Sequence, residues 1–138
     1  MMVTKKYLDE LTYSVIGAAI EVHKTMGRGL LESIYHQCLI VELRQRNINF
    51  QTELLIPFKY KETPINLNLR CDLFIEKCLV VELKSVGEMS NIFEAQLLSY
   101  MKLLQSPKGI LINFNCANIF KDGQKTFVNQ YYNQLLDL

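Results

Sequence analysis

The sequence predicts an α/β protein in which helices flank a mixed β-sheet. Apolar residues recur at helical spacing up to about residue 46, and from residue 48 they alternate with polar ones as in strands. The expected order is two helices, three strands, a helix and a strand. That order implies an antiparallel part first, after which the third helix crosses over to a further strand.

Two amphipathic helices are expected in the N-terminal third. The first covers residues 8 to about 24, and the stretch from Met26 to Gly29 ends it, because glycine readily adopts the left-handed geometry of a helix stop. The second covers residues 30 to 46. Its expected buried residues are Leu31, Ile34, Cys38 and Val41, with Leu43 as a further candidate.

Three strands should follow. The first contains Phe50, Leu54 and Ile56, with an extension past Pro57 left open, and residues 61–64 form a turn. In the second, residues 65–75, apolar residues share one face (Ile65, Leu67, Leu69, Cys71, Leu73 and Ile75) and polar residues share the other (Asn66, Asn68, Arg70 and Asp72). A turn at residues 76–77 leads into the third strand, residues 78–85, which should pair with the second as an antiparallel hairpin.

A third helix should begin near residue 91 and end before Pro107, with Asn91 or Ser90 as its cap. Residues 109–114 form a continuously apolar strand, as expected for the interior of a sheet. A turn at residues 121–124 precedes a tail that is either strand or helix. The Tyr131-Tyr132 pair in that tail is a candidate to cover a sheet edge or to form a homodimer contact.

Composition sets the broad class. The chain has 138 residues, 49% of them apolar and 21% charged, which favours one globular domain over residues 1–138. Its net charge of +1 gives no general basic field, which counts mildly against tight, unspecific binding to long nucleic acid. No signal peptide or membrane span is apparent, and four unclustered cysteines favour a reducing cytoplasm over a disulfide or zinc framework.

Three polar residues carry the functional prediction: Asp72, Glu82 and Lys84. In the expected hairpin, positions 72 and 82 lie opposite each other, with Cβ atoms roughly 5 Å apart. Two such carboxylates repel unless a cation or a proton lies between them, and Mg²⁺ or Mn²⁺ suits oxygen ligands of this kind. Lys84 shares their face and would orient or deprotonate a water, or offset charge on a phosphate-like transition state. On the residues alone, a solvated network of ion pairs explains the same pattern equally well.

Other polar residues are secondary candidates. Gln96 and Tyr100 share one face of the third helix, directly after the strand that carries Glu82. Glu32 begins the second helix, where the helix dipole is a sufficient reason for a carboxylate. His23 is expected to cap a helix or to lie on the surface, and Asn113 and Asn115 are weak candidates at the end of the last core strand.

These residues, taken in order, resemble the PD-(D/E)XK nuclease superfamily. Asp72, Glu82-Leu83-Lys84 and the element from Gln96 to Tyr100 match its motif, and the segment from Gly29 to Tyr35 matches the Gly-x-x-Glu-x-x-Tyr (GxxExxY) motif of a small bacterial branch. The similarity extends over about residues 8 to 128. Two residues depart from it: Cys71, because the motif places proline before the aspartate, and Phe93, because related sequences often have histidine there.

The resemblance implies a restriction-endonuclease-like core and, in active members, magnesium-dependent phosphodiester hydrolysis of DNA or RNA. By position, Asp72 and Glu82 are expected to hold Mg²⁺ or Mn²⁺, with Glu32 or, as a weaker candidate, Glu21 as an additional carboxylate. Lys84, Gln96 and Tyr100 complete the expected catalytic set. Two alternatives stay open: a non-catalytic module of the same fold that binds nucleic acid or a protein, and a hydrolase of small nucleotides.

Overall fold

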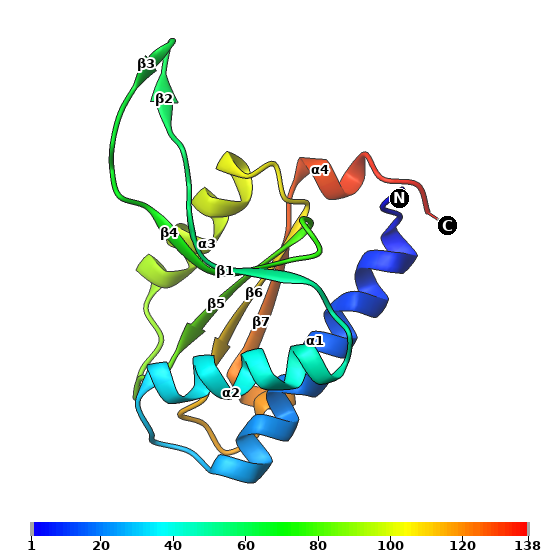
Figure 1. Cartoon of the computed structure of the whole chain (residues 1–138), viewed down its shortest axis with the longest axis vertical. Coiled ribbons are helices and arrows are strands. Elements are labelled where there is room, and N and C mark those ends of the chain that lie inside the picture. Colours follow the sequence, from blue (N-terminus) through cyan, green and yellow to red (C-terminus); the bar gives the residue numbers. More distant parts are fainter. Residues whose placement is uncertain (1, 138) are drawn as a thin grey trace.

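A five-stranded mixed sheet forms the centre of the computed structural model, which describes residues 2–137 (Figure 1). The strand order is β1-β4-β5-β6-β7. The strands are β1 (Phe50–Leu55), β4 (Arg70–Ile75), β5 (Leu79–Lys84), β6 (Lys108–Asn113) and β7 (Gln124–Val128). Only β5 and β6 are parallel, so the predicted mixed α/β architecture is confirmed and is consistent with a restriction-endonuclease-like fold.

Helices cover both faces of the sheet. On one face, α1 (Lys5–Met26) and α2 (Glu32–Gln45) pack over the alternate buried residues of β4, β5 and β6. On the other face, Leu97, Tyr100 and Met101 of α3 (Asn91–Leu103) pack against Phe74 and Val80. Each sheet face therefore has an apolar core of its own.

The crossover from β5 to β6 follows the prediction. The hydroxyl of Ser90 accepts a hydrogen bond from the Ile92 backbone N–H and caps α3, which decides between the two expected caps. All six residues of β6 are buried, as its central apolar run indicated, and they include the polar residues Lys108 and Asn113 at its two ends. Beyond β6 the expected turn is a short π-helix, η1 (Ile119–Gly123), and the tail contains both β7 and a four-residue helix, α4 (Gln130–Asn133).

The second helix buries a different face from the one predicted. Leu31 and Val41 are 71% and 50% exposed, whereas Tyr35 and Leu39 are fully buried; of the expected residues only Leu43, the further candidate, is fully buried. Ile34 is likewise exposed and Cys38 is only partly buried. The anchor is Tyr35, whose ring stacks on Phe114 with centroids 4.4 Å apart and so fixes the rotation of α2.

The strand predicted over residues 65–75 is also shorter than expected. The sheet strand β4 contains only residues 70–75. One further hydrogen bond, from the Ile56 N–H to the Leu69 carbonyl, extends the pairing with the β1 side, and Pro57 has no backbone N–H to continue the ladder. Instead, β2 (Lys59–Tyr60) and β3 (Thr63–Pro64) form a separate hairpin that projects from the body of the molecule (Figure 1). Ile65 and Leu67 are therefore exposed rather than buried.

No helix within residues 2–137 combines the length and the apolar character needed to cross a membrane.

Candidate functional site

Asp72 and Glu82 meet where the β4–β5 ladder ends. The register pairs Leu73 with Val81, so the next positions outward are 72 and 82, as the hairpin predicted. At this point a side chain, and not a backbone carbonyl, accepts the hydrogen bond from β5: the Asp72 Oδ2 accepts a bond of 2.8 Å from the Leu83 N–H. The first carboxylate is thus fixed against the strand that carries the second.

Glu82 is a buried carboxyl group that lacks a complete set of partners. It is 3% exposed, and its Oε1 has no hydrogen-bond partner among the described residues. Burial raises the pKa of Glu82 far above its usual range, and the neighbouring Asp72 carboxyl raises it further. A bound divalent cation would supply both the missing partner and the missing positive charge, so the donor set fits a hard metal ion.

A third carboxylate approaches from α2. Glu32 is the first residue of that helix, and partial burial, followed by the charge of Asp72, raises the pKa of its side chain. The positive charge of Lys84 lowers the pKa of Glu32. Glu32 therefore belongs to the same electrostatic cluster as Asp72 and Lys84.

The loop before α2 explains how Glu32 is placed there. Gly27 and Gly29 have φ values of +79° and +86°, which side chains other than glycine rarely adopt. The Tyr35 hydroxyl donates a 2.7 Å hydrogen bond to the Gly27 carbonyl and accepts one of 3.0 Å from the Leu30 N–H. In this chain, the glycine and tyrosine of the Gly-x-x-Glu-x-x-Tyr segment fix the loop from which the glutamate emerges.

Lys84 ends β5 and lies between the sheet and α3. Its Nζ is 4.4 Å from the centroid of the Phe93 ring. It forms no ion pair within 4.0 Å with any carboxylate of residues 2–137. Its charge nevertheless lowers the pKa of both Glu32 and Glu82, so it remains close to the acidic cluster.

Gln96 and Tyr100 lie on the face of α3 that adjoins the cluster. The Gln96 Nε2 donates a 2.8 Å hydrogen bond to the Tyr100 hydroxyl. Tyr100 is 4% exposed, and burial raises the pKa of its phenol, with further contributions in the same direction from Glu82 and Asp72. The structure thus brings this pair beside the two carboxylates.

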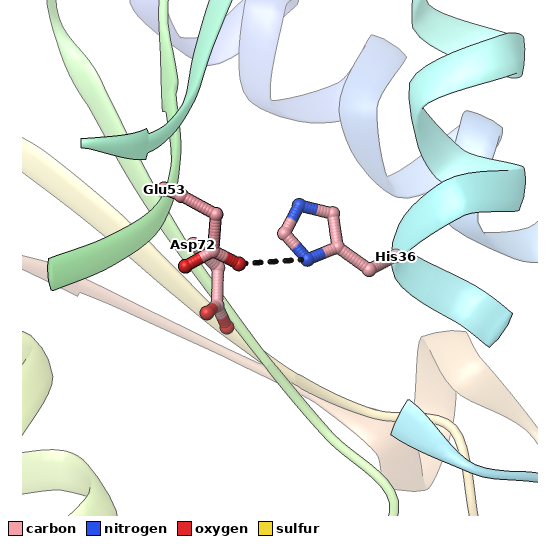
Figure 2. Close-up of side chains that lie close together, drawn as sticks. All are labelled: His36, Glu53 and Asp72. Carbon is pink, nitrogen blue, oxygen red and sulfur yellow. Dashed lines mark ion pairs between the residues drawn. The ribbon is translucent and has the colours of Figure 1, made fainter. Parts of the chain in front are cut away.

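Two residues that the sequence did not single out, His36 and Glu53, form a second group of potential ligands with Asp72. His36, Glu53 and Asp72 each offer one ligand atom within 4.8 Å of the others (Figure 2). The His36 Nδ1 is 3.5 Å from Glu53 Oε1, and its Nε2 is 2.8 Å from the Thr52 hydroxyl. This is the compact group of potential metal ligands in residues 2–137, and Glu82 lies outside it.

The sequence carries little sign of these two residues. His36 lies on a helix face whose burial was predicted incorrectly, and Glu53 belongs to an ordinary polar strand pattern. Glu53 adopts a left-handed backbone with φ of +51°, a conformation that residues other than glycine seldom adopt, and nothing local in the sequence demands it.

The remaining candidates have other surroundings. Glu21 is exposed on α1 and accepts a hydrogen bond from the Thr25 hydroxyl. His23 is partly buried and bonds through Nε2 to the Cys116 carbonyl. Asn113 bonds to both backbone groups of Val86 and so closes a loop. Asn115 meets Arg28 at the surface.

One comparison with known proteins gives a match. A family model described as the PD-(D/E)XK nuclease superfamily matches residues 9–127. No curated protein and no solved structure matches the chain significantly.

Proposed function

Because this chain belongs to the PD-(D/E)XK nuclease superfamily, we propose that it is a phosphodiester hydrolase of nucleic acid that depends on Mg²⁺ or Mn²⁺, and that it falls in the GxxExxY branch. The observation that supports this most is the unpartnered Glu82 Oε1, buried beside Asp72. The proposed metal ligands are Asp72, Glu82 and Glu32, and the proposed catalytic side chains are Lys84, Gln96 and Tyr100.

Each side chain has a defined task in this proposal. Asp72, Glu82 and Glu32 would hold the cation, which would lower the pKa of a bound water and offset charge on the phosphate. Lys84 presents its ammonium group to the water or to the developing phosphate charge. Gln96 orients the Tyr100 hydroxyl through the hydrogen bond between them, so that the hydroxyl can donate to a phosphate oxygen.

The cellular setting is part of the proposal. Cys38, Cys71, Cys78 and Cys116 are all free thiols, three of them buried. Free buried thiols support a reducing cytoplasm as the place of action.

Metal binding is the first test. We expect wild-type protein to bind Mn²⁺ or Mg²⁺ in isothermal titration calorimetry, and we expect Asp72→Asn and Glu82→Gln to reduce the affinity at least tenfold. Glu62→Gln is a matched control, because Glu62 is exposed on the projecting hairpin and pairs there with Lys59. Equal affinity in wild type and the Asp72→Asn variant would reject the site.

Cleavage is the second test. With metal bound, wild-type protein should hydrolyse single-stranded or duplex DNA, RNA or bis(p-nitrophenyl) phosphate, and Lys84→Met should lower kcat by about 10²-fold or more. Metal binding without cleavage of any of these substrates would favour the non-catalytic module. Hydrolysis of nucleotides but not of polymers would favour the small-nucleotide hydrolase.

A further inference from the structure

The Lys84 ammonium group rests on an aromatic ring and not on a carboxylate. Its 4.4 Å distance to the Phe93 centroid is the shortest lysine–ring or arginine–ring distance among the described residues, where the others are 5.5 to 5.8 Å. Both side chains are partly buried. A cation over the face of a ring is attracted by the ring quadrupole, more strongly where water is excluded.

This arrangement is notable because an anionic partner is nearby. Glu82 precedes Lys84 by two residues on the same strand, and one of its oxygens is free. No carboxylate of residues 2–137 comes within 4.0 Å of the Lys84 Nζ, however. The ammonium group therefore lies over the ring and beyond ion-pair distance of every described carboxylate.

The position of Phe93 follows from α3. The Ser90 cap fixes where this helix begins, and Phe93 lies in its first turn. Phe93, Gln96 and Tyr100 are spaced by three and four residues, so they form one stripe along the helix. The stripe that carries the Gln96–Tyr100 pair thus also carries the ring against Lys84.

We propose that Phe93 is a positioning residue for Lys84: its ring keeps the ammonium group in one place and clear of the metal-binding carboxylates. Lysine has a flexible stem that loses considerable rotamer freedom when it is fixed. Without the ring, the ammonium group would pair with Glu82 or Asp72 and compete with the cation. This inference rests on the function proposed above for the same site.

A double-mutant cycle of metal affinity tests the role of Phe93. Phe93→Leu should weaken Mn²⁺ binding about 2- to 30-fold, the range that corresponds to the strength of a cation–ring contact. In a Lys84→Met background the same substitution should leave affinity unchanged, because no ammonium group remains to compete. Equal weakening in both backgrounds would mean that Phe93 acts only through packing and would overturn the proposal.

A spectroscopic test is independent of metal and of activity. The Lys84 side-chain ¹³Cε–¹Hε signal, assigned with Lys84→Met, should be shifted upfield by the ring in wild type. It should move to the ordinary lysine position in Phe93→Leu. An unshifted lysine signal in wild type would show that the contact does not exist.

An activity assay with metal bound is a separate test. Mono-, di- and trifluorinated phenylalanine at position 93 should lower kcat stepwise as the ring quadrupole weakens.

Phe127→Leu is the matched control for these measurements, because Phe127 also contacts a lysine, Lys125, but at 5.5 Å on β7. It should change neither Mn²⁺ affinity nor the Lys84 signal. Failure of the proposed function appears separately, as wild-type protein that binds no metal and yet has a shifted Lys84 signal.

Discussion

At the scale of single residues, the site is organised around charge that the fold leaves unbalanced. Asp72 lies at the end of its ladder with its carboxylate on the Leu83 N–H, and Glu82 is buried next to it with an unpartnered oxygen. Burying a carboxyl group without partners costs stability, and the group responds by retaining its proton. Without a cation, the proposed metal site is therefore expected to lower the stability of the folded protein.

The pH dependence of stability tests this in metal-free protein in EDTA. An unfolded glutamate titrates near pH ~4.3, and burial, then Asp72, raises the folded-state pKa of Glu82 far above that value. Protonated Glu82 therefore contributes to the free energy of unfolding in full below about pH 4. This contribution is lost as the pH rises toward the folded-state pKa, at up to about 1.4 kcal/mol per pH unit. Over pH 5 to 8 the melting temperature of wild type should fall relative to that of Glu82→Gln. Parallel curves would contradict the raised pKa.

At the scale of elements, the α1–α2 loop links fold and site. The Tyr35 hydroxyl bonds to backbone groups of both Gly27 and Leu30 from a buried position. Because Glu32 follows this loop directly, the same hydrogen bonds that stabilise the helix pair also orient the third carboxylate. The Gly-x-x-Glu-x-x-Tyr segment thus contains both a tyrosine that stabilises the loop, Tyr35, and a candidate metal ligand, Glu32.

We expect Tyr35→Phe to destabilise the protein by about 1–3 kcal/mol, because a backbone donor and a backbone acceptor lose their buried partner. Urea unfolding followed by circular dichroism measures this, with Tyr13→Phe as the control, since Tyr13 is 74% exposed. Ring stacking on Phe114 is retained in the variant. A loss of stability no larger than in the control would show that the hydroxyl does not hold the loop.

At the scale of the whole molecule, hydrogen bonds join the N-terminal and C-terminal segments of the described chain. The Leu136 carbonyl accepts a hydrogen bond from the Lys5 N–H. Buried Lys108 of β6 donates a 2.7 Å hydrogen bond to Asp9, which also accepts one from the Tyr132 hydroxyl. The C-terminal segment therefore packs on α1. Tyr132, one of the two tyrosines predicted to cover a sheet edge or form a dimer contact, bonds to Asp9 of its own chain.

Asp9→Asn should destabilise the protein by about 1–3 kcal/mol, because Lys108 is 8% exposed and loses its counter-charge. Thermal unfolding checks this, and Glu10→Gln, the exposed neighbour on the same helix, should have little effect. Adding Lys108→Met to Asp9→Asn should recover most of the lost stability. No recovery would mean that Asp9 acts through contacts other than Lys108.

Much of the site was predictable because it depends on local geometry. Strand alternation and a two-residue turn were enough to place residues 72 and 82 opposite each other, and helical spacing paired Gln96 with Tyr100. His36 and Glu53 were not predictable in this way. Their approach depends on the rotation of α2 and on a left-handed residue in β1, both of which are set by distant packing.

The sequence by itself determined the two N-terminal helices, the β4–β5 hairpin, the crossover to β6 and the shared location of Asp72, Glu82 and Lys84, because short-range periodicity encodes each of them. Only the tertiary structure decided which face of α2 is buried, that residues 65–69 leave the sheet, and that Phe93 receives the Lys84 ammonium group. Those outcomes depend on contacts between residues far apart in the chain, such as the stacking of Tyr35 on Phe114. The periodicity of one segment does not determine such contacts.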